Sequence, residues 1–165
     1  MVLNDAEIYG KAEVSGGVVS GGRIFGYAKV SGTSFVSGGD VKGHAVVQGE
    51  AQVAGGEVRG KAVVSGGRIQ ENASIWGGHV MRDAMVEGNA NIRGGIVEGG
   101  LVRGNAVVFD GQIKGGLVEG DASIRAGVIE DGDHEVGSAQ ISIQDDFSEH
   151  CDTEMQNVLG KAFGN

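Results

Sequence analysis

The sequence predicts an all-β protein: a single-stranded β-helix (solenoid) with three sides and about seven to eight coils, followed by a short C-terminal α-helix. Three observations carry this prediction. A short unit of the form Ala-x-Val/Ile-x-Gly-x recurs between residues 8 and 129. The central aliphatic residues of these units are spaced by five or six positions. Like residues also align in columns when three units are taken per coil.

The central aliphatic residues and the glycines that follow them predict where the strands and the corners lie. They occupy 23 positions, and 18 of these are followed two residues later by glycine. The exceptions are Glu71, Arg82, Asp110, Ala126 and Asp131. In an Ala-x-Val unit, the first and third side chains point to the same side of a strand, so stacked units bury a column of Val and Ile with Ala beside it. Because glycine supplies the backbone angles of corners, the 33 glycines indicate recurring corners and not disorder.

The number of sides follows from the columns. Three sides give coils of 16 or 17 residues, and Asn72, Asn89, Asn105 and Asp121 then share one corner column. Coils with two sides align no such column. Stacked amide side chains can hydrogen-bond to one another and to local backbone. At ~4.8 Å per strand, the predicted solenoid is roughly 35–40 Å long.

The units resemble those of hexapeptide-repeat proteins, in which an aliphatic residue is followed four positions later by a small one, as Val30 is by Ser34 and Val47 by Ala51. The resemblance covers about residues 5–129 and implies a left-handed β-helix. About half of the sides here have five residues instead of six, and this mixed spacing also resembles that of bactofilins, polymerising β-helices with three sheets. The handedness is therefore open, with left-handed favoured.

The repeat ends after Ile129, which divides the chain into a solenoid over 1–137 and a C-terminal segment over 138–165. Residues 131–137 are expected to form an irregular acidic turn, and residues 140–144 a last strand. Asp146 with Glu149 suggests a capping box that opens a helix. The apolar stripe of this helix includes Phe147, Met155 and Leu159, and we expect it to cap the solenoid or to join subunits.

The net charge of −9 is concentrated in the tail, because residues 1–129 carry −1 and residues 130–165 carry −8. A rod that mimics DNA would need negative charge along its whole length, so this distribution argues against a DNA mimic. Every apolar run is too short to span a membrane. The N-terminal residues lack the features of a signal peptide. The single cysteine allows no internal disulfide. We therefore expect a cytoplasmic protein.

One outward column is both aromatic and cationic, and we call it the aromatic–basic strip. Its members immediately follow the central residues of one side: Tyr9, Phe25, Lys42, Arg59, Trp76, Arg93, Phe109 and Arg125. Lys11, Tyr27, His44 and Lys61 lie beside it at a corner. The strip is expected either to bind an anionic ligand or protein, with aromatic rings stacking on the partner's rings, or to be covered by the acidic C-terminal helix or another subunit. Stacked arginine and aromatic side chains also favour one another within a sheet. Nucleic acid is a disfavoured partner.

A second outward set is apolar and indicates self-association into a homo-oligomer. It includes Val46, Val63 and Ile96 on one side and Met85, Leu101 and Leu117 on the next, with Val128, Val18 and Phe35 in the same columns.

Catalytic candidates are weak. The resemblance to hexapeptide acyltransferases implies a histidine on a loop extruded from the solenoid, and the repeat leaves no room for such a loop. His79 and His134 are the two catalytic candidates, and neither a metal site nor a cofactor is expected. The sequence thus favours a non-enzymatic scaffold that presents a flat face to a partner. An acyltransferase-like enzyme and a bactofilin-like filament are the alternatives.

Overall fold

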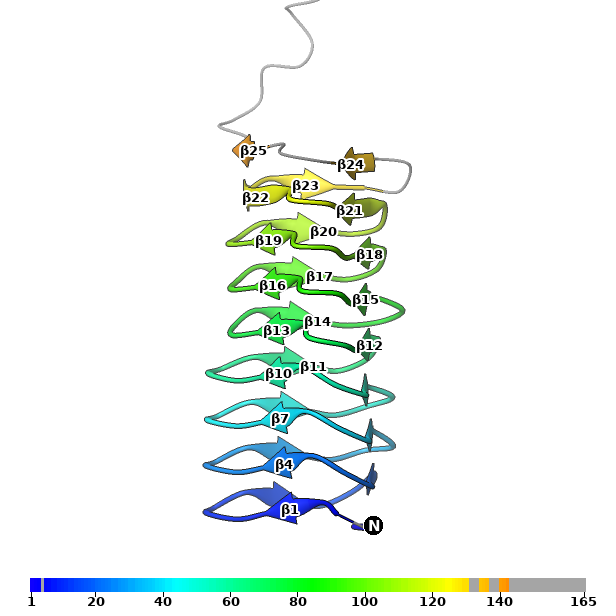
Figure 1. Ribbon diagram of the computed structural model, residues 1–165, viewed down its shortest axis with the longest axis vertical. Helices are drawn as coiled ribbons and strands as arrows, with labels where there is room; N and C mark the ends of the chain where they lie inside the picture. The colour runs from blue at the N-terminus through cyan, green and yellow to red at the C-terminus, as the bar shows by residue number, and fades with distance from the viewer. Residues whose placement is uncertain (4, 131–133, 137–139, 143–165) are drawn as a thin grey trace, which may run out of the picture.

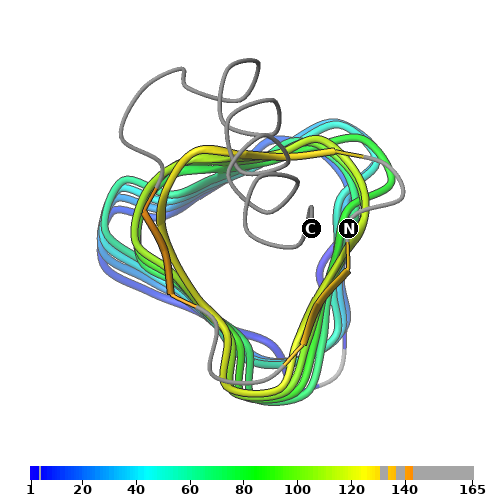
Figure 2. The same ribbon diagram turned by 90° about the horizontal axis from the view of Figure 1, so that it is seen from above.

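The computed structural model describes residues 1–3, 5–130, 134–136 and 140–142, the last two segments as backbone alone. The chain winds into a stack of coils (Figure 1) with a triangular cross-section (Figure 2). Each side is a parallel β-sheet in which every strand pairs with the strand three places later in the chain. The prediction of an all-β solenoid with three sides is confirmed.

The three sheets are numbered in the order in which the chain first meets them, and most of their strands are two residues long. Sheet I contains β1 (Glu7–Ile8), β4 (Arg23–Ile24), β7 (Asp40–Val41), β10 (Glu57–Val58), β13 (Ser74–Ile75), β16 (Asn91–Ile92), β19 (Val107–Val108), β22 (Ser123–Ala126) and β25 (Gln140–Ser142). Sheet II contains β2 (Glu13–Val14), β5 (Lys29–Val30), β8 (Val46–Val47), β11 (Val63–Val64), β14 (His79–Val80), β17 (Ile96–Val97), β20 (Gln112–Ile113) and β23 (Val128–Ile129). Sheet III contains β3 (Val18–Val19), β6 (Phe35–Val36), β9 (Gln52–Val53), β12 (Arg68–Ile69), β15 (Met85–Val86), β18 (Leu101–Val102), β21 (Leu117–Glu119) and β24 (His134–Val136).

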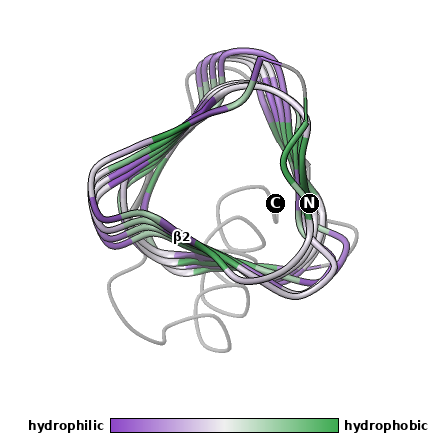
Figure 3. Ribbon diagram, turned by 90° about the horizontal axis from the view of Figure 1, so that it is seen from below, coloured by the Kyte–Doolittle hydropathy of each residue, from purple (hydrophilic) through white to green (hydrophobic). Residues whose placement is uncertain are grey.

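The core consists of the three inward columns of Val and Ile. Residues such as Ile24, Ile75 and Ile113 are completely buried, and so are alanines two places before an inward residue, such as Ala45 and Ala62. Full burial of each branched side chain contributes about 1.5–3 kcal/mol. Hydropathy follows the same plan, with apolar sides and polar corners (Figure 3). The sheets therefore hold their outward side chains on a rigid frame.

The corners are of two kinds, which explains the mixed spacing of five and six. A six-residue side turns through a left-handed residue, then an exposed residue, then a buried alanine, as at Gly43 (φ 71°), His44 and Ala45. Most five-residue sides turn through two glycines; at Gly111 and Gly127 the first of the two residues is Asp110 or Ala126. Glu71 (φ 57°) and Arg82 (φ 56°) adopt the same left-handed conformation without being glycine. These two exceptions to the glycine pattern therefore leave the path of the chain unchanged.

The expectation for residues 131–137 is wrong in part. His134–Val136 form β24, which pairs with β21 in parallel, with Leu117 opposite His134. The ladder of sheet III continues there because the chain completes another side of the coil instead of leaving the solenoid. β25 confirms a strand within 140–144 and pairs with β22 in sheet I. The helix predicted from Asp146 lies outside the described residues. Within the described part of the chain, no helix is long and apolar enough to cross a membrane.

Candidate binding face

Sheet I places the eight residues of the aromatic–basic strip in one register. Each follows an inward residue, and in the seven strip residues from Tyr9 to Phe109 the amide nitrogen donates to the carbonyl of the inward residue one rung above. Examples are Arg59 to Ile75 (2.8 Å), Trp76 to Ile92 (2.8 Å) and Arg93 to Val108 (2.7 Å). The sheet therefore brings these side chains together along the solenoid axis, on the face that carries β1, β4, β7 and β10 in Figure 1.

The rings and cations of the strip stack on one another. Tyr9 and Phe25 have ring centroids 4.9 Å apart and planes inclined by only 8°. The guanidinium of Arg59 lies 4.3 Å from the ring centroid of Trp76. Phe109 has two such neighbours, Arg93 at 5.1 Å and Arg125 at 5.8 Å. Because parallel rungs are ~4.8 Å apart, flat groups in register meet face to face.

This stacking alters one expectation about how the strip meets a partner. The rings of Phe25 and Phe109 each have neighbours from more than one rung against them, so they offer a partner mainly their edges. The prediction that they would stack on a partner's rings does not fit this geometry. Guanidinium groups packed on rings nonetheless keep their N–H edges available for anions.

Beside the lower half of the strip, from Tyr9 to Arg59, the same face carries acids that the column pattern missed. They come from the residue before the inward one, an outward position on the same strands. Asp40 accepts two hydrogen bonds from Arg23, from Nε at 2.8 Å and Nη2 at 2.5 Å. This hydrogen bonding, with the carboxylate charge, raises the pKa of Arg23 above its ordinary value. Glu57 pairs with Lys42 and lies 3.5 Å from Arg59.

The upper half of the strip has no such acids. The equivalent outward positions there hold Ser74, Asn91, Val107 and Ser123. Within the described part of the chain, neither Arg93 nor Arg125 forms an ion pair.

A ladder of amides runs along the corner beside this upper half, as predicted from the column of like residues. Asn72 Nδ2 donates to Asn89 Oδ1 (3.3 Å), Asn89 Nδ2 to Asn105 Oδ1 (3.0 Å), and Asn105 Nδ2 to Asp121 Oδ1 (2.9 Å). The opposite corner of sheet I carries Lys11, Tyr27, His44 and Lys61. There Tyr27 and His44 stack with centroids 4.9 Å apart, and Lys11 lies 5.2 Å from the centre of the Tyr27 ring.

The apolar outward residues form ladders on sheets II and III. Met85, Leu101 and Leu117 face one another on consecutive rungs of sheet III, and Val46 faces Val63 on sheet II. His79 separates Val63 from Ile96. All six apolar residues are half-buried, because neighbours in register cover one another. In the same columns, Phe35 (42%) and Val128 (40%) are more exposed. Phe147, Met155 and Leu159 lie outside the described residues.

The histidines are spread over separate sheets and a corner. His79 lies on β14 of sheet II, whereas His134 lies on β24 of sheet III. Consecutive strands between Glu7 and Ile129 are joined by at most four residues. In the ranges that the structure describes, no group of three His, Cys, Asp or Glu side chains could hold a metal ion.

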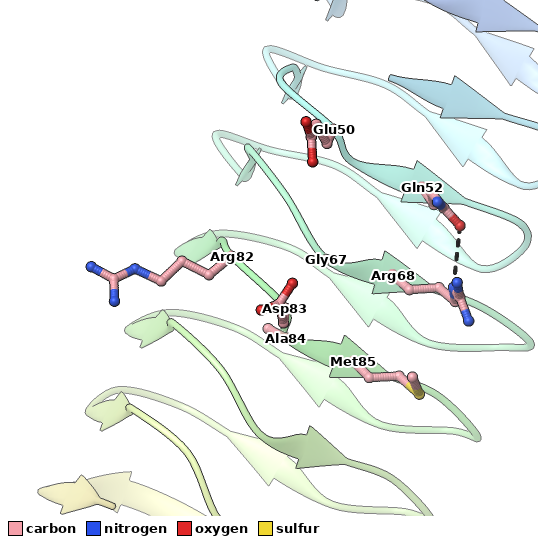
Figure 4. A pocket seen from close by; sticks show the side chains of 8 residues that line it. All are labelled: Glu50, Gln52, Gly67, Arg68, Arg82, Asp83, Ala84 and Met85. Atoms are coloured by element: carbon pink, nitrogen blue, oxygen red, sulfur yellow. Dashed lines mark hydrogen bonds between the residues drawn. The ribbon is translucent and has the colours of Figure 1, made fainter. Parts of the chain in front are cut away.

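A notch of about 330 Å³ interrupts the corner between sheets II and III, and the columns gave no sign of it. It forms where the two-glycine corner at Gly67 lies between the longer corners of Glu50 and Asp83. Both carboxylates point into the notch (Figure 4), whereas Arg82 points away. Arg82 instead pairs with Glu98 at 2.8 Å. The alternation of long and short sides is the sequence signal that could have located this notch.

The assignment of sheet I as a candidate binding face rests on the geometry given above. Comparisons with protein-family models, curated proteins and solved structures found no match to this chain.

Proposed function

We propose that the protein is a non-enzymatic β-solenoid scaffold whose aromatic–basic strip binds an anionic partner. The observation that carries this proposal is the alternation of Arg59, Trp76, Arg93, Phe109 and Arg125 on consecutive rungs, with guanidinium groups against ring faces. Stacking limits the freedom of each guanidinium before a partner arrives, which lowers the entropic cost of binding. The free N–H edges then suit carboxylate, sulfate or phosphate oxygens.

A protein of net charge −9 offers a sharp test of this proposal. At low salt and pH 7, only a local cationic surface can hold such a chain on a sulfonate-bearing matrix. We expect the protein to be retained. The triple variant Arg59→Ala, Trp76→Ala, Arg93→Ala should elute with the unbound fraction while keeping its far-ultraviolet circular dichroism.

The matched control removes two arginines from another side, Arg68→Ala with Arg103→Ala on sheet III. This control should elute like the parent protein. Equal retention of the triple variant and the parent, or a parent that passes straight through the matrix, would contradict the proposal.

We propose further that the scaffold self-associates through sheet III. The apolar ladder of Met85, Leu101 and Leu117 supports this, because half-buried aliphatic groups in one column lose their remaining hydration when a second copy covers them. Light scattering should give a mass of more than one chain for the parent and of one chain for Leu101→Asp. Gln112→Asp, an outward change on sheet II, is the control and should keep the parent mass. A parent of one-chain mass would refute this second proposal.

A further inference from the structure

The two halves of the strip differ in how their charge is balanced. In the lower half, the strip residues Lys42 and Arg59 both lie beside Glu57. Arg23, which precedes the inward Ile24 on the same face, pairs with Asp40. In the upper half, Arg93 and Arg125 contact the Phe109 ring and have no acidic partner within the described residues. A ligand anion must displace an existing partner in the lower half, but none in the upper half. An external anion therefore binds with the most favourable free energy at the upper half, where no existing ion pair has to be broken.

The free cations recur on alternate rungs. Arg93 lies on the rung of β16 and Arg125 on that of β22, with Phe109 between them. At ~4.8 Å per rung, the two arginines are about 9.6 Å apart along the axis. Arg59, which Glu57 neutralises in part, continues the same interval below. The face thus presents sparse positive charges in a straight line.

Neutral hydrogen-bonding groups accompany these charges. Asn72, Asn89 and Asn105 line the neighbouring corner, and each uses one Nδ2 proton in the ladder. An amide group has two such protons, so each keeps one for a ligand. A partner rich in hydroxyl groups would accept hydrogen bonds at its oxygens from these donors.

The same features argue against other polyanions. Single-stranded nucleic acid binds through many phosphate contacts and through bases stacked on open ring faces. In the upper half of the strip, only Arg93 and Arg125 are cations without an acidic partner within the described residues, and both already lie against the Phe109 ring. In an extended acidic peptide, side chains on one face recur every ~6.6 Å, out of step with the arginines. A helical acidic segment, with a repeat of about 10.5 Å over seven residues, fits the interval better but lacks the hydroxyl groups.

We infer that the upper half of the strip, on β13, β16, β19 and β22, binds a linear acidic polysaccharide that carries a carboxylate on alternate sugars. Successive rings of an extended polysaccharide advance by about one rung, so carboxylates on every second sugar meet Arg93 and Arg125. The intervening hydroxyl groups meet the amides. This inference rests on the proposed function and adds the class of ligand and its place on the strip.

The test is calorimetric titration of the full chain with hyaluronate oligosaccharides, which have this alternating charge, with neutral dextran as the blank. We expect binding of hyaluronate and no heat with dextran. The double variant Arg93→Ala, Arg125→Ala should weaken binding by roughly tenfold or more for each arginine lost. The matched control, Arg23→Ala with Lys29→Ala, removes two ion-paired cations of the lower coils that lie outside the strip, and should change the affinity less than threefold.

Titrations with polyglutamate and single-stranded DNA separate the alternatives. Tighter binding of either polymer than of hyaluronate would overturn the ligand class and leave the anion-binding function standing. Equal losses from the upper and lower double variants would overturn the location. Absence of binding to all three polymers would overturn this inference, whereas the proposed function fails only if retention on the sulfonate matrix is also absent.

Discussion

At the scale of single residues, the corners depend on a backbone conformation that most side chains resist. Glu71 and Arg82 hold left-handed angles where most six-residue sides have glycine. A left-handed residue with a Cβ costs about 1–2 kcal/mol. Glu71 Oε2 accepts a hydrogen bond from the Gly88 amide (2.9 Å), and Arg82 pairs with Glu98 (2.8 Å). Such exposed contacts offset the cost only in part.

Comparing glycine with alanine at position 82 measures the cost of the left-handed backbone there separately from the loss of the Arg82 side chain. Both Arg82→Gly and Arg82→Ala remove the ion pair with Glu98, but only glycine relieves the left-handed strain. We expect the glycine variant to have the higher free energy of unfolding, by about 1 kcal/mol, in urea denaturation.

Position 103 provides the control for this comparison. Arg103 also pairs with an acid of the next rung, Glu119, but has no left-handed backbone. There the order should reverse, and the free energy of unfolding of Arg103→Gly should be lower than that of Arg103→Ala by roughly 0.5–1 kcal/mol. The same order at both positions would show that the strain at Arg82 is not significant.

At the scale of the elements, the amide ladder has a direction. Each Nδ2 group donates to the residue one rung above, and Asp121, a carboxylate that only accepts, ends the described series. The ladder therefore needs donors below and an acceptor at its end. This requirement explains why an acid follows three asparagines in one column.

The direction of the ladder predicts unequal effects of substitution. Asn89→Ala removes one donated and one accepted hydrogen bond, and should lower the free energy of unfolding by about 1–2 kcal/mol. Asp121→Asn keeps an acceptor for Asn105, so it should change the free energy of unfolding by less than roughly 0.5 kcal/mol. Thermal and urea unfolding of both variants measure the difference, and similar losses at the two positions would contradict the directional ladder.

The elements also show how far the sequence could be interpreted without coordinates. Spacing alone placed Arg59, Trp76 and Arg93 in one column, because the alternation within each strand and the three sides per coil determine register even though coils vary between 16 and 17 residues. The contact of Arg93 with Phe109 agrees with the expectation that such side chains favour one another within a sheet. Side-chain rotation has no fixed period, so the spacing could not show that this stacking turns the ring faces away from a partner. The partners Asp40 and Glu57 were overlooked because the pattern followed only the residue after each inward position. His134 was misplaced because the change in repeat after Ile129 hid a further strand.

At the scale of the whole molecule, the stabilising contacts between coils follow one another along the solenoid axis. The contacts of each strand are mainly with the strands one rung above and below. The stability of such an array is close to a sum of terms for each coil and each interface between neighbours. Damage in the middle therefore separates two stacks, whereas damage near an end removes only the outer coils.

Two equivalent core substitutions should reveal this difference. Ile75, in the middle of sheet I, and Ile124, near the upper end, are both fully buried, so truncation of either to alanine leaves a cavity that costs about 2–5 kcal/mol. Trp76 is the single tryptophan, and its emission reports the middle of the rod. Circular dichroism reports all coils.

In urea, we expect Ile75→Ala to shift both transitions together to lower concentration. Ile124→Ala should begin to lose circular dichroism early while the midpoint of Trp76 emission stays close to that of the parent, because the lower coils keep their contacts after the upper ones open. Equal shifts of the emission midpoint in both variants would mean instead that the solenoid unfolds as one cooperative unit, with coupling between coils stronger than the loss at any single one.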